Sequence, residues 1–252
     1  PSDVAARLMA GGVVPLNGIA EAMNAAQAAA DVCAPHWMPL WSAGALDGAA
    51  QLVSEADAKA ALALHGLDVP RLVTCQAAVA GAAAAQFDDP GAGKGVGLAH
   101  KSDAGAVRLN VDPADVAAVA AEIGTDTVLI EEMIDGAVAE LILGVVRDPA
   151  HGFVLTIGAG GVLAEVLRDT ASLLLPASGD DIARALDSLA IAPVLQGYRG
   201  ACPAARDRIS AAANALQAYV FETQSTLEEV EINPLICTPD RAVAVDALIR
   251  KV

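Results

Sequence analysis

The segment TVLIEEMIDGAVAELILGVVRDPAHGFVLTIG, residues 127–158, decides the fold class of this chain. It contains three runs of apolar and β-branched residues, a composition that favours strands. Asp135-Gly136 separates the first run from the second, and Asp148-Pro149 separates the second from the third; both dipeptides are turn signals. The segment therefore predicts consecutive strands joined by short turns, as in antiparallel hairpins.

Helical and strand patterns follow one another outside this segment in an order typical of an α+β protein. The expected helices cover residues 17–31, which Asn17 caps; the segment that begins after its cap Ser54 and ends at Gly66; 80–89; 113–123, which follows Asp112; 179–189, which Ser178 caps; and 203–221. The other expected strands are 106–111, 227–236 and 241–249, the last two joined through Thr238, Pro239 and Asp240. Helices come early, hairpin-like strand pairs dominate the middle, and one long helix precedes a terminal hairpin. This order excludes the regular strand–helix alternation of a doubly wound fold.

The charge of the chain excludes two classes of partner. Its 252 residues suggest one or two domains, and 15 Lys and Arg stand against 31 Asp and Glu, which gives a formal net charge of -16. Nucleic-acid binding needs a basic surface, and so does binding to an anionic membrane. The apolar runs are too short to span a bilayer. We therefore expect no nucleic-acid partner and no membrane partner.

Cysteine usage and the N-terminal sequence bear on the cellular compartment. The four cysteines, at positions 33, 75, 202 and 237, include no CxxC pair and no zinc knuckle. Reduced thiols in a cytoplasmic protein are the simpler interpretation. Residues 1–10 lack the charged and apolar regions of a secretory signal, and a start at Pro1 indicates a trimmed chain or a piece of a larger one.

A glycine-rich motif, GAGKG at 91–95, looks like a phosphate loop but fails its pattern. A Walker A motif needs Gly five residues before its Gly-Lys pair and Ser or Thr after the lysine. Asp88 and Gly95 stand at those two positions. What remains is Lys94 in a glycine-rich strand or loop, either as a point charge for nucleotide phosphates or as a surface lysine.

Two further segments could carry chemistry, and each has a plainer interpretation. HKSDAG at 100–105 places His100 in a glycine-flanked turn, where an imidazole can act as base, ligand or phosphoryl acceptor; the alternative is a solvated turn. GAGG at 158–161 would bring backbone N–H groups close to an anion. It misses the dinucleotide-binding spacing, because the third required glycine would fall at Leu163.

Carboxylates gather in the last strands of the chain, within EEVEINPL at 228–235. Strand alternation puts Glu229, Glu231 and Asn233 on one face. A short hairpin then brings Asp246 alongside them. Carboxylate and amide oxygens on adjacent strands suit Mg²⁺, while a solvated acidic strand face is the alternative interpretation.

Taken together, these segments resemble the ATP-grasp domain of NDP-forming acyl-CoA synthetases, the ADP-forming acetate–CoA ligase type within the succinyl-CoA synthetase superfamily. The resemblance rests on ordered motifs: HKSDAGAVRLNV, VLIEEMI, AELILGVVRDPAHGFVLTIGAGGVLAEVLRD, LQGYRG, and EEVEINPLI followed by VDA. It covers residues 51–252 and implies an ATP-grasp fold of two α+β subdomains, 51–130 and 131–252. Residues 1–50 resemble the tail of the α/β CoA-ligase domain that precedes this domain in fused members.

The resemblance also implies a role for each matching residue. These residues are Lys94 for the nucleotide phosphates; Gly160 and Gly161 for a turn facing them; Glu131, Glu132 and Met133 for the adenine-reading hinge; Glu140 for the ribose; Arg199 for the terminal phosphate; Asn233 and Asp246, with Glu231 beside them, for the metal; and His100 for a phosphoryl relay. One departure is Gly91-Ala92-Gly93, which stands where the family has an apolar, β-branched strand and which is a poor strand former.

The implied reaction is the reversible conversion of a carboxylic acid, CoA and ATP to acyl-CoA, ADP and phosphate through phosphohistidine. ATP/ADP and Mg²⁺ are the implied cofactors, since phosphoryl transfer needs charge neutralisation and positioning. CoA would be bound mainly by a CoA-ligase domain or subunit outside this chain. The acyl substrate and the choice between ATP and GTP are not readable from these residues. Two alternatives stay open: another ATP-grasp carboxylate ligase that needs no phosphohistidine, and a non-catalytic nucleotide-binding or assembly subunit.

Overall fold

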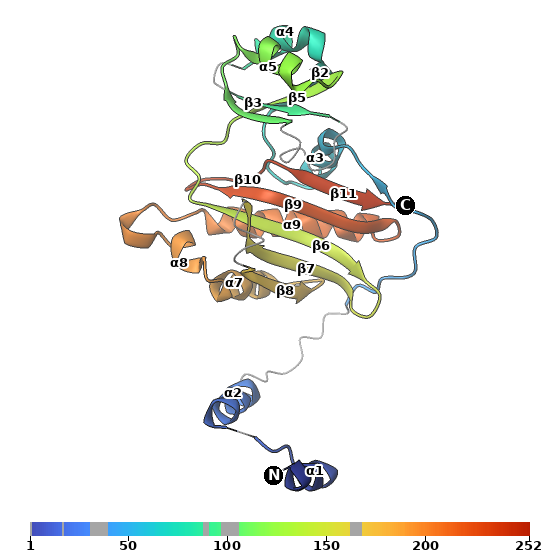
Figure 1. Cartoon of the computed structure of the whole chain (residues 1–252), viewed down its shortest axis with the longest axis vertical. Coiled ribbons are helices and arrows are strands. Elements are labelled where there is room, and N and C mark those ends of the chain that lie inside the picture. Colours follow the sequence, from blue (N-terminus) through green and yellow to red (C-terminus); the bar gives the residue numbers. More distant parts are fainter. Residues whose placement is uncertain (1, 17, 31–39, 88–90, 97–105, 162–167) are drawn as a thin grey trace. The chain divides into compact units, whose positions relative to one another are not determined.

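The structure is a computed structural model that describes residues 2–16, 18–30, 40–87, 91–96, 106–161 and 168–252. The chain forms two compact units, Pro1–Met38 and Pro39–Val252. The first unit contains α1 (Ser2–Ala10) and α2 (Ile19–Ala30). The second helix confirms the helical pattern expected there, while its expected cap, Asn17, lies outside the described residues. The remaining elements belong to the second unit (Figure 1).

The larger sheet of the second unit is antiparallel and joins strands that lie far apart in the sequence. Its order is β1-β11-β9-β6-β7-β8, with β10 paired to β9 beside this path (Figure 1). The strands are β1 (Gln51–Leu52), β6 (Ala139–Asp148), β7 (Gly152–Ala159), β8 (Thr170–Leu174), β9 (Leu227–Cys237), β10 (Ala242–Ala244) and β11 (Ala247–Lys251). Leu141 pairs with Ala159 on one side and with Leu235 on the other, so β6 has a ladder along both edges.

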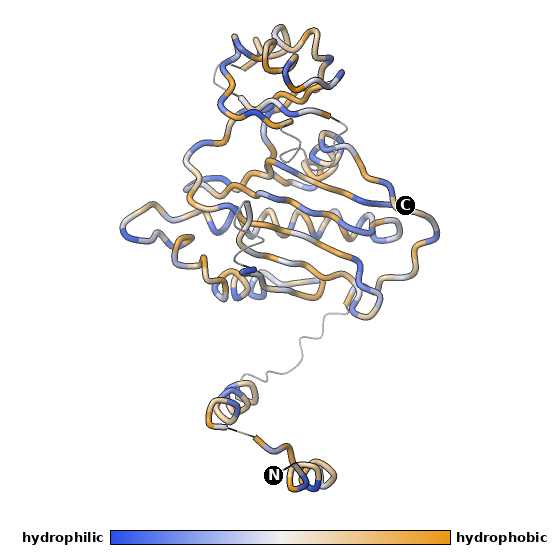
Figure 2. Tube along the Cα trace, in the orientation of Figure 1, coloured by the Kyte–Doolittle hydropathy of each residue, from blue (hydrophilic) through white to orange (hydrophobic). Residues whose placement is uncertain are grey.

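Helices cover one face of this sheet and bury its apolar side chains. They are α3 (Glu55–Ala63), α7 (Gly179–Ser188), α8 (Ala192–Leu195) and α9 (Arg206–Thr223). Leu141, Leu143 and Val145 alternate along β6 and are fully buried, as strand periodicity requires of a core-facing side. Figure 2 shows apolar residues running through the strands of this sheet. The core lies between the sheet and the helices.

The smaller sheet has four strands in the order β2-β5-β3-β4, again antiparallel. Its elements are β2 (Leu72–Gln76), η1 (Ala77–Val79), α4 (Ala80–Ala84), β3 (Gly91–Gly95), β4 (Val107–Val111), α5 (Val116–Ile123) and β5 (Thr127–Glu132). Val128 and Ile130 of β5 pack with Ala80 and Ala120 of the two helices. Two antiparallel sheets with helices confirm the expected α+β class.

Local signals predicted several elements correctly. Ser54 caps α3 by accepting the N–H of Asp57, and Ser178 forms a complete capping box with Asp181 at α7. Asp148 Oδ1 accepts two backbone N–H groups in the turn between β6 and β7, which confirms that hairpin. Each of these hydrogen bonds joins residues at most three positions apart, so the sequence alone was sufficient to predict these caps and this turn.

The expected hairpin at Asp135-Gly136 is wrong. The strand before it, β5, pairs with β2 and β3, whereas the strand after it, β6, pairs with β7 and β9. Residues 133–138 therefore connect two sheets. A turn signal reports a local change of direction, and the choice of sheet partner depends on strands elsewhere in the chain.

Three smaller expectations also need correction. The helix expected at 113–123 begins only at Val116, because Asp112 Oδ1 accepts the N–H of Ala114 in a turn. The helix expected over 80–89 ends at Ala84. The terminal strand expected over 241–249 is interrupted at Val245 and Asp246, between β10 and β11. No helix among the described residues is long and apolar enough to cross a membrane.

Candidate functional site

The expected metal ligands lie where β9 meets the break between β10 and β11. The backbone N–H of Asn233 donates to the carbonyl of Asp246 at 3.3 Å, which confirms that the terminal hairpin places these two residues side by side. Glu231 and Asn233 are half-buried and alternate with fully buried Val230 and Ile232, so they share one face of β9.

Negative charge is concentrated around Glu231. Burial raises the pKa of its carboxyl, and the nearby carboxylates of Glu229 and Asp246 raise that pKa further, against a hydrogen bond with Asn233 that lowers it. A divalent cation would relieve this repulsion, and Mg²⁺ prefers carboxylate and amide oxygens. The described residues contain no group of three or more His, Cys, Asp or Glu side chains arranged for a metal. Asn233, which forms a hydrogen bond with Glu231, adds an amide oxygen beside these carboxylates.

The glycine turn after β7 closes onto the same place. The N–H of Gly161 donates to Asn233 Oδ1 at 3.1 Å, and the N–H of Gly160 donates to the carbonyl of Glu140 at 2.8 Å. Gly161 has a φ of +68°, and a Cβ at that position would collide with the carboxylate of Glu140. Glycine is favoured here, because any other residue would adopt a strained left-handed conformation and displace the Glu140 carboxylate. The turn, Glu140 and Asn233 thus form one constellation.

Lys94 lies in β3 and is buried, with 6% of its surface exposed. Its ammonium lies 2.8 Å from Glu55 Oε1 and 2.8 Å from Glu131 Oε2, and it donates to the carbonyl of Val245 at 2.6 Å. Despite burial, which lowers the pKa of a lysine, the carboxylates of Glu131, Glu55 and Asp246 raise its pKa above the ordinary value. Lys94 is therefore a firmly charged cation next to Asp246, and not a surface lysine.

A second buried lysine, Lys59 of α3, was not expected from the sequence. It is completely buried and donates to Glu55 Oε1 at 2.7 Å, to Glu131 Oε1, and to the carbonyl of Val245 at 2.6 Å. Burial, followed by the charge of Lys94, lowers the pKa of Lys59. Glu55 and Lys59 stand at i and i+4, a spacing that is typical of exposed pairs, so the sequence carried no signal that this pair is buried.

The four side chains of Glu55, Lys59, Lys94 and Glu131 form what we call the lysine–carboxylate cluster. It connects α3, β3 and β5 with the backbone of Val245, which belongs to the break between β10 and β11. The cluster therefore ties the smaller sheet to the larger sheet immediately beside Asp246.

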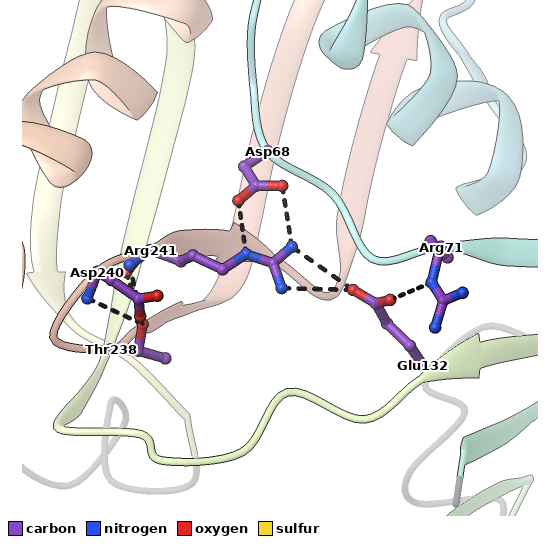
Figure 3. Close-up of polar contacts among 6 residues, drawn as sticks. All are labelled: Asp68, Arg71, Glu132, Thr238, Asp240 and Arg241. Atoms are coloured by element: carbon purple, nitrogen blue, oxygen red, sulfur yellow. Dashed lines mark hydrogen bonds and ion pairs between the residues drawn. The ribbon is translucent and has the colours of Figure 1, made fainter. Parts of the chain in front are cut away.

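The expected hinge residues divide between two environments. Glu131 belongs to the lysine–carboxylate cluster, and Met133 begins the connection between the sheets. Glu132 binds two arginines: Nε of Arg71 at 2.6 Å and Nη1 of Arg241 at 3.4 Å. Figure 3 shows Arg241 between Glu132 and Asp68. The guanidinium of Arg241 donates two hydrogen bonds to the Asp68 carboxylate, at 3.0 and 3.1 Å.

Arg199, like Glu132 and Met133, makes no described contact with the glycine turn, Glu140 or Asn233. Arg199 is exposed in η3 (Tyr198–Gly200), has a φ of +53°, and places its guanidinium 5.2 Å from the ring centre of Tyr198. His100 lies outside the described residues. The roles of all the expected site residues stay predictions.

Comparison with known proteins identifies the class to which this arrangement belongs. A family model described as an ATP-grasp domain matches residues 44–250, and the chain therefore belongs to the ATP-grasp family. The chain is 34% identical over 222 residues to a trans-feruloyl-CoA synthase, FCS1, from an unknown prokaryotic organism; the match covers 81% of the chain and 31% of the synthase. It is 28% identical over 162 residues to the beta subunit of an ADP-forming acetate–CoA ligase I of Pyrococcus furiosus, covering 60% of the chain and 69% of that subunit.

A solved structure shares the fold of this chain. It is a dinucleotide-forming acetyl-coenzyme A synthetase 1 of Ca. Korarchaeum cryptofilum with coenzyme A and Ca-AMPCP; it has a TM-score of 0.74 and 25% identity, and the match covers 80% of this chain and 93% of that one. The same synthetase with coenzyme A and Mg-AMPPCP gives a TM-score of 0.70 and 27% identity, covering 79% and 92%. These matches confirm the expected resemblance to the ATP-grasp domain of ADP-forming acyl-CoA ligases.

Proposed function

We propose that this chain is the nucleotide-binding, phosphoryl-transferring part of an NDP-forming acyl-CoA synthetase. The observation that carries the proposal is the meeting of three parts at one place: the glycine turn with Glu140, the oxygen donors Asn233 and Asp246, and a buried lysine. These parts bring together a glycine turn that a phosphate can approach closely, oxygens that suit Mg²⁺, and a positive charge, which are the requirements of phosphoryl transfer.

The residues of the chain have separate tasks in this proposal. The glycine turn, where no side chain blocks close approach, and the ammonium of Lys94 are proposed to bind and orient the phosphates, and Arg199 is proposed to bind the terminal one. Glu140 is proposed to bind the ribose, and residues 131–133, at the end of β5, are proposed to bind the base. Glu231, Asn233 and Asp246 would hold Mg²⁺, which when bound neutralises phosphate charge.

His100 is the proposed phosphoryl relay. Its ring nitrogen would attack the terminal phosphorus, the bond from that phosphorus to the bridging oxygen would break, and ADP would leave as phosphohistidine forms. In the Korarchaeum synthetase bound to Mg-AMPPCP, the phosphohistidine segment points towards the nucleotide-binding site. That arrangement supports a phosphohistidine route for this chain.

The complete reaction would require a second part. The chain spans less than a third of the length of the feruloyl-CoA synthase that it matches, and it aligns with a beta subunit of an acetate–CoA ligase. We therefore propose that a CoA-ligase domain or subunit binds CoA and the carboxylic acid, and that residues 1–50 are the tail of such a domain, preceding an ATP-grasp domain of two subdomains, 51–130 and 131–252.

Two measurements test the proposal. Titration calorimetry of the full chain with ATP should show binding that weakens when Mg²⁺ is removed with EDTA and when Asp246 is replaced by Asn. Incubation with γ-labelled ATP and Mg²⁺ should then give acid-labile, base-stable label on the protein, lost in His100→Asn. His151→Asn is the matched control, because His151 lies exposed in the β6–β7 turn and binds Asp148 at 2.8 Å.

The outcomes separate the alternatives. Failure of the chain to bind Mg·ATP would contradict the proposal and favour a non-catalytic assembly subunit. Binding without label, both alone and after addition of a CoA-ligase subunit, would favour an ATP-grasp ligase that transfers the phosphoryl group directly to a carboxylate.

A further inference from the structure

The ammonium of Lys94 has no N–H group left for a phosphate in this structure. A lysine ammonium has three donors. Those of Lys94 are directed to three acceptors: Glu55, Glu131 and the carbonyl of Val245, at 2.8, 2.8 and 2.6 Å. To bind a nucleotide phosphate, Lys94 must give up at least part of the lysine–carboxylate cluster.

Leaving the cluster would be costly if Lys94 were the only cation there. Glu55 and Glu131 are 8% and 1% exposed, and removal of one partner from a buried ion pair leaves an uncompensated charge. Lys59 changes this balance, because it contacts the same two carboxylates and the same Val245 carbonyl as Lys94. The cluster thus holds two ammonium groups and two carboxylates around shared acceptors.

We propose that Lys59 is the counter-charge residue of the nucleotide site: it keeps an ammonium group beside Glu55 and Glu131 when Lys94 moves to the phosphates. This inference rests on the proposed function. Lys59 touches no reacting group and acts as a positioning residue through Lys94. Glu55 acts in the opposite sense, since its carboxylate holds Lys94 in the cluster and so opposes nucleotide binding.

The positions of the four side chains in the fold support this role. Glu55 and Lys59 come from α3, one turn apart on the same helix, whereas Lys94 and Glu131 come from neighbouring strands β3 and β5. Lys59 is therefore attached to a different element from Lys94. Movement of the Lys94 side chain leaves the contacts of Lys59 with Glu55 and Val245 in place.

The charge count in each variant predicts a distinctive order of Mg·ATP affinity. With Lys59→Met, departure of Lys94 leaves two carboxylates without a cluster cation, so affinity should fall by about tenfold or more. With Glu55→Gln, departure of Lys94 leaves one lysine and one carboxylate, and affinity should rise above that of the unchanged chain. The affinity of the double variant should lie between that of the unchanged chain and that of Lys59→Met, because only one carboxylate, Glu131, loses both of its lysines.

The test is titration calorimetry of Mg·ATP with each full-length variant, accompanied by thermal unfolding. Lys251→Met is the matched control, since Lys251 is exposed in β11, and its affinity should equal that of the unchanged chain. A merely structural cluster would lower stability in Lys59→Met and Glu55→Gln alike and would not raise affinity in either. Higher affinity combined with lower stability in Glu55→Gln is therefore the decisive signature.

Each result has one meaning. An unchanged Mg·ATP affinity in Lys59→Met, or a lowered affinity in Glu55→Gln, would overturn the counter-charge role of Lys59. The proposed function would still stand in that case, provided that the unchanged chain binds Mg·ATP. If Lys59→Met does not fold, Glu55→Gln alone decides. Undiminished affinity in Lys94→Met would overturn the phosphate role of Lys94 and the counter-charge role together. Absence of Mg·ATP binding by the unchanged chain would overturn the proposed function and this inference.

Discussion

Filling the space beside Gly93 should stabilise the smaller sheet. A small apolar cavity of about 10 Å³ lies between β3 and α5, and Gly93, Val119 and Ile123 contribute to its lining. A Cβ at Gly93 would lie 3.7 Å from Val119 Cγ1 and 3.8 Å from Ile123 Cδ1, which are ordinary contact distances. The perturbation is therefore Gly93→Ala.

The expected magnitude has two parts. Glycine in a strand interior costs roughly 0.5–1 kcal/mol relative to alanine because it loses more backbone entropy on folding. Burial of one additional carbon contributes about 0.8 kcal/mol. Together they raise the free energy of unfolding by about 1–2 kcal/mol, which corresponds to about 2–8 °C in the melting temperature of a domain of this size.

Urea unfolding followed by circular dichroism is the assay, with the slope of the transition checked for constancy. Gly91→Ala is the matched control in the same strand, because a Cβ there would lie only 2.7 Å from the carbonyl oxygen of Glu131 and must destabilise the sheet. A midpoint for Gly93→Ala that equals or falls below that of the unchanged chain, with an unchanged slope, would refute the reasoning about the cavity.

Three further predictions test other parts of the structure. Gly161→Ala should lower Mg·ATP affinity in calorimetry, since a side chain at φ +68° costs about 1 kcal/mol and displaces the Glu140 carboxylate. Unchanged affinity would show that this turn does not contribute to nucleotide binding. Burial lowers the pKa of His65, but hydrogen bonds to the Ala61 carbonyl and the Glu222 carboxylate outweigh it and raise that pKa. The charged form of His65 therefore stabilises the fold fully below pH 6.5, and this stabilisation is lost as the pH rises through the raised pKa. The difference in melting temperature between the unchanged chain and His65→Gln should narrow between pH 6 and 9. A difference that stays constant with pH would contradict a raised pKa. Arg241→Ala should cost about 1 kcal/mol in urea unfolding, and less in high salt, because its bonds to Asp68 are partly exposed; equal losses at both salt concentrations would argue against an ionic contribution.

The candidate site was partly readable from the sequence. Strand alternation correctly placed Glu231 and Asn233 on one face, and the short terminal hairpin correctly placed Asp246 beside them. Both features depend on residues of one hairpin. The contact between Gly161 and Asn233 joins residues 72 positions apart, and only the resemblance to a known family suggested that these two segments share a site.

GAGKG shows how tertiary structure overrides a local preference. Its glycines are poor strand formers, yet residues 91–95 form β3 between β5 and β4, with a ladder on each side. At Gly91 the absence of a side chain allows the Glu131 carbonyl to approach closely. Neighbouring strands therefore hold a segment whose own propensity is weak.

The sequence by itself determined the features that arise within a few residues: the caps at Ser54 and Ser178, the turn at Asp148, the alternation along β9 and the α+β order. Only the tertiary structure decided that Asp135-Gly136 joins two sheets, and that Glu55 and Lys59 are buried with Lys94 and Glu131. Hydrogen bonds in a cap or turn form between close neighbours in the chain. Burial of a charge depends on which distant elements pack around it, because only their combined acceptors and counter-charges replace the lost water.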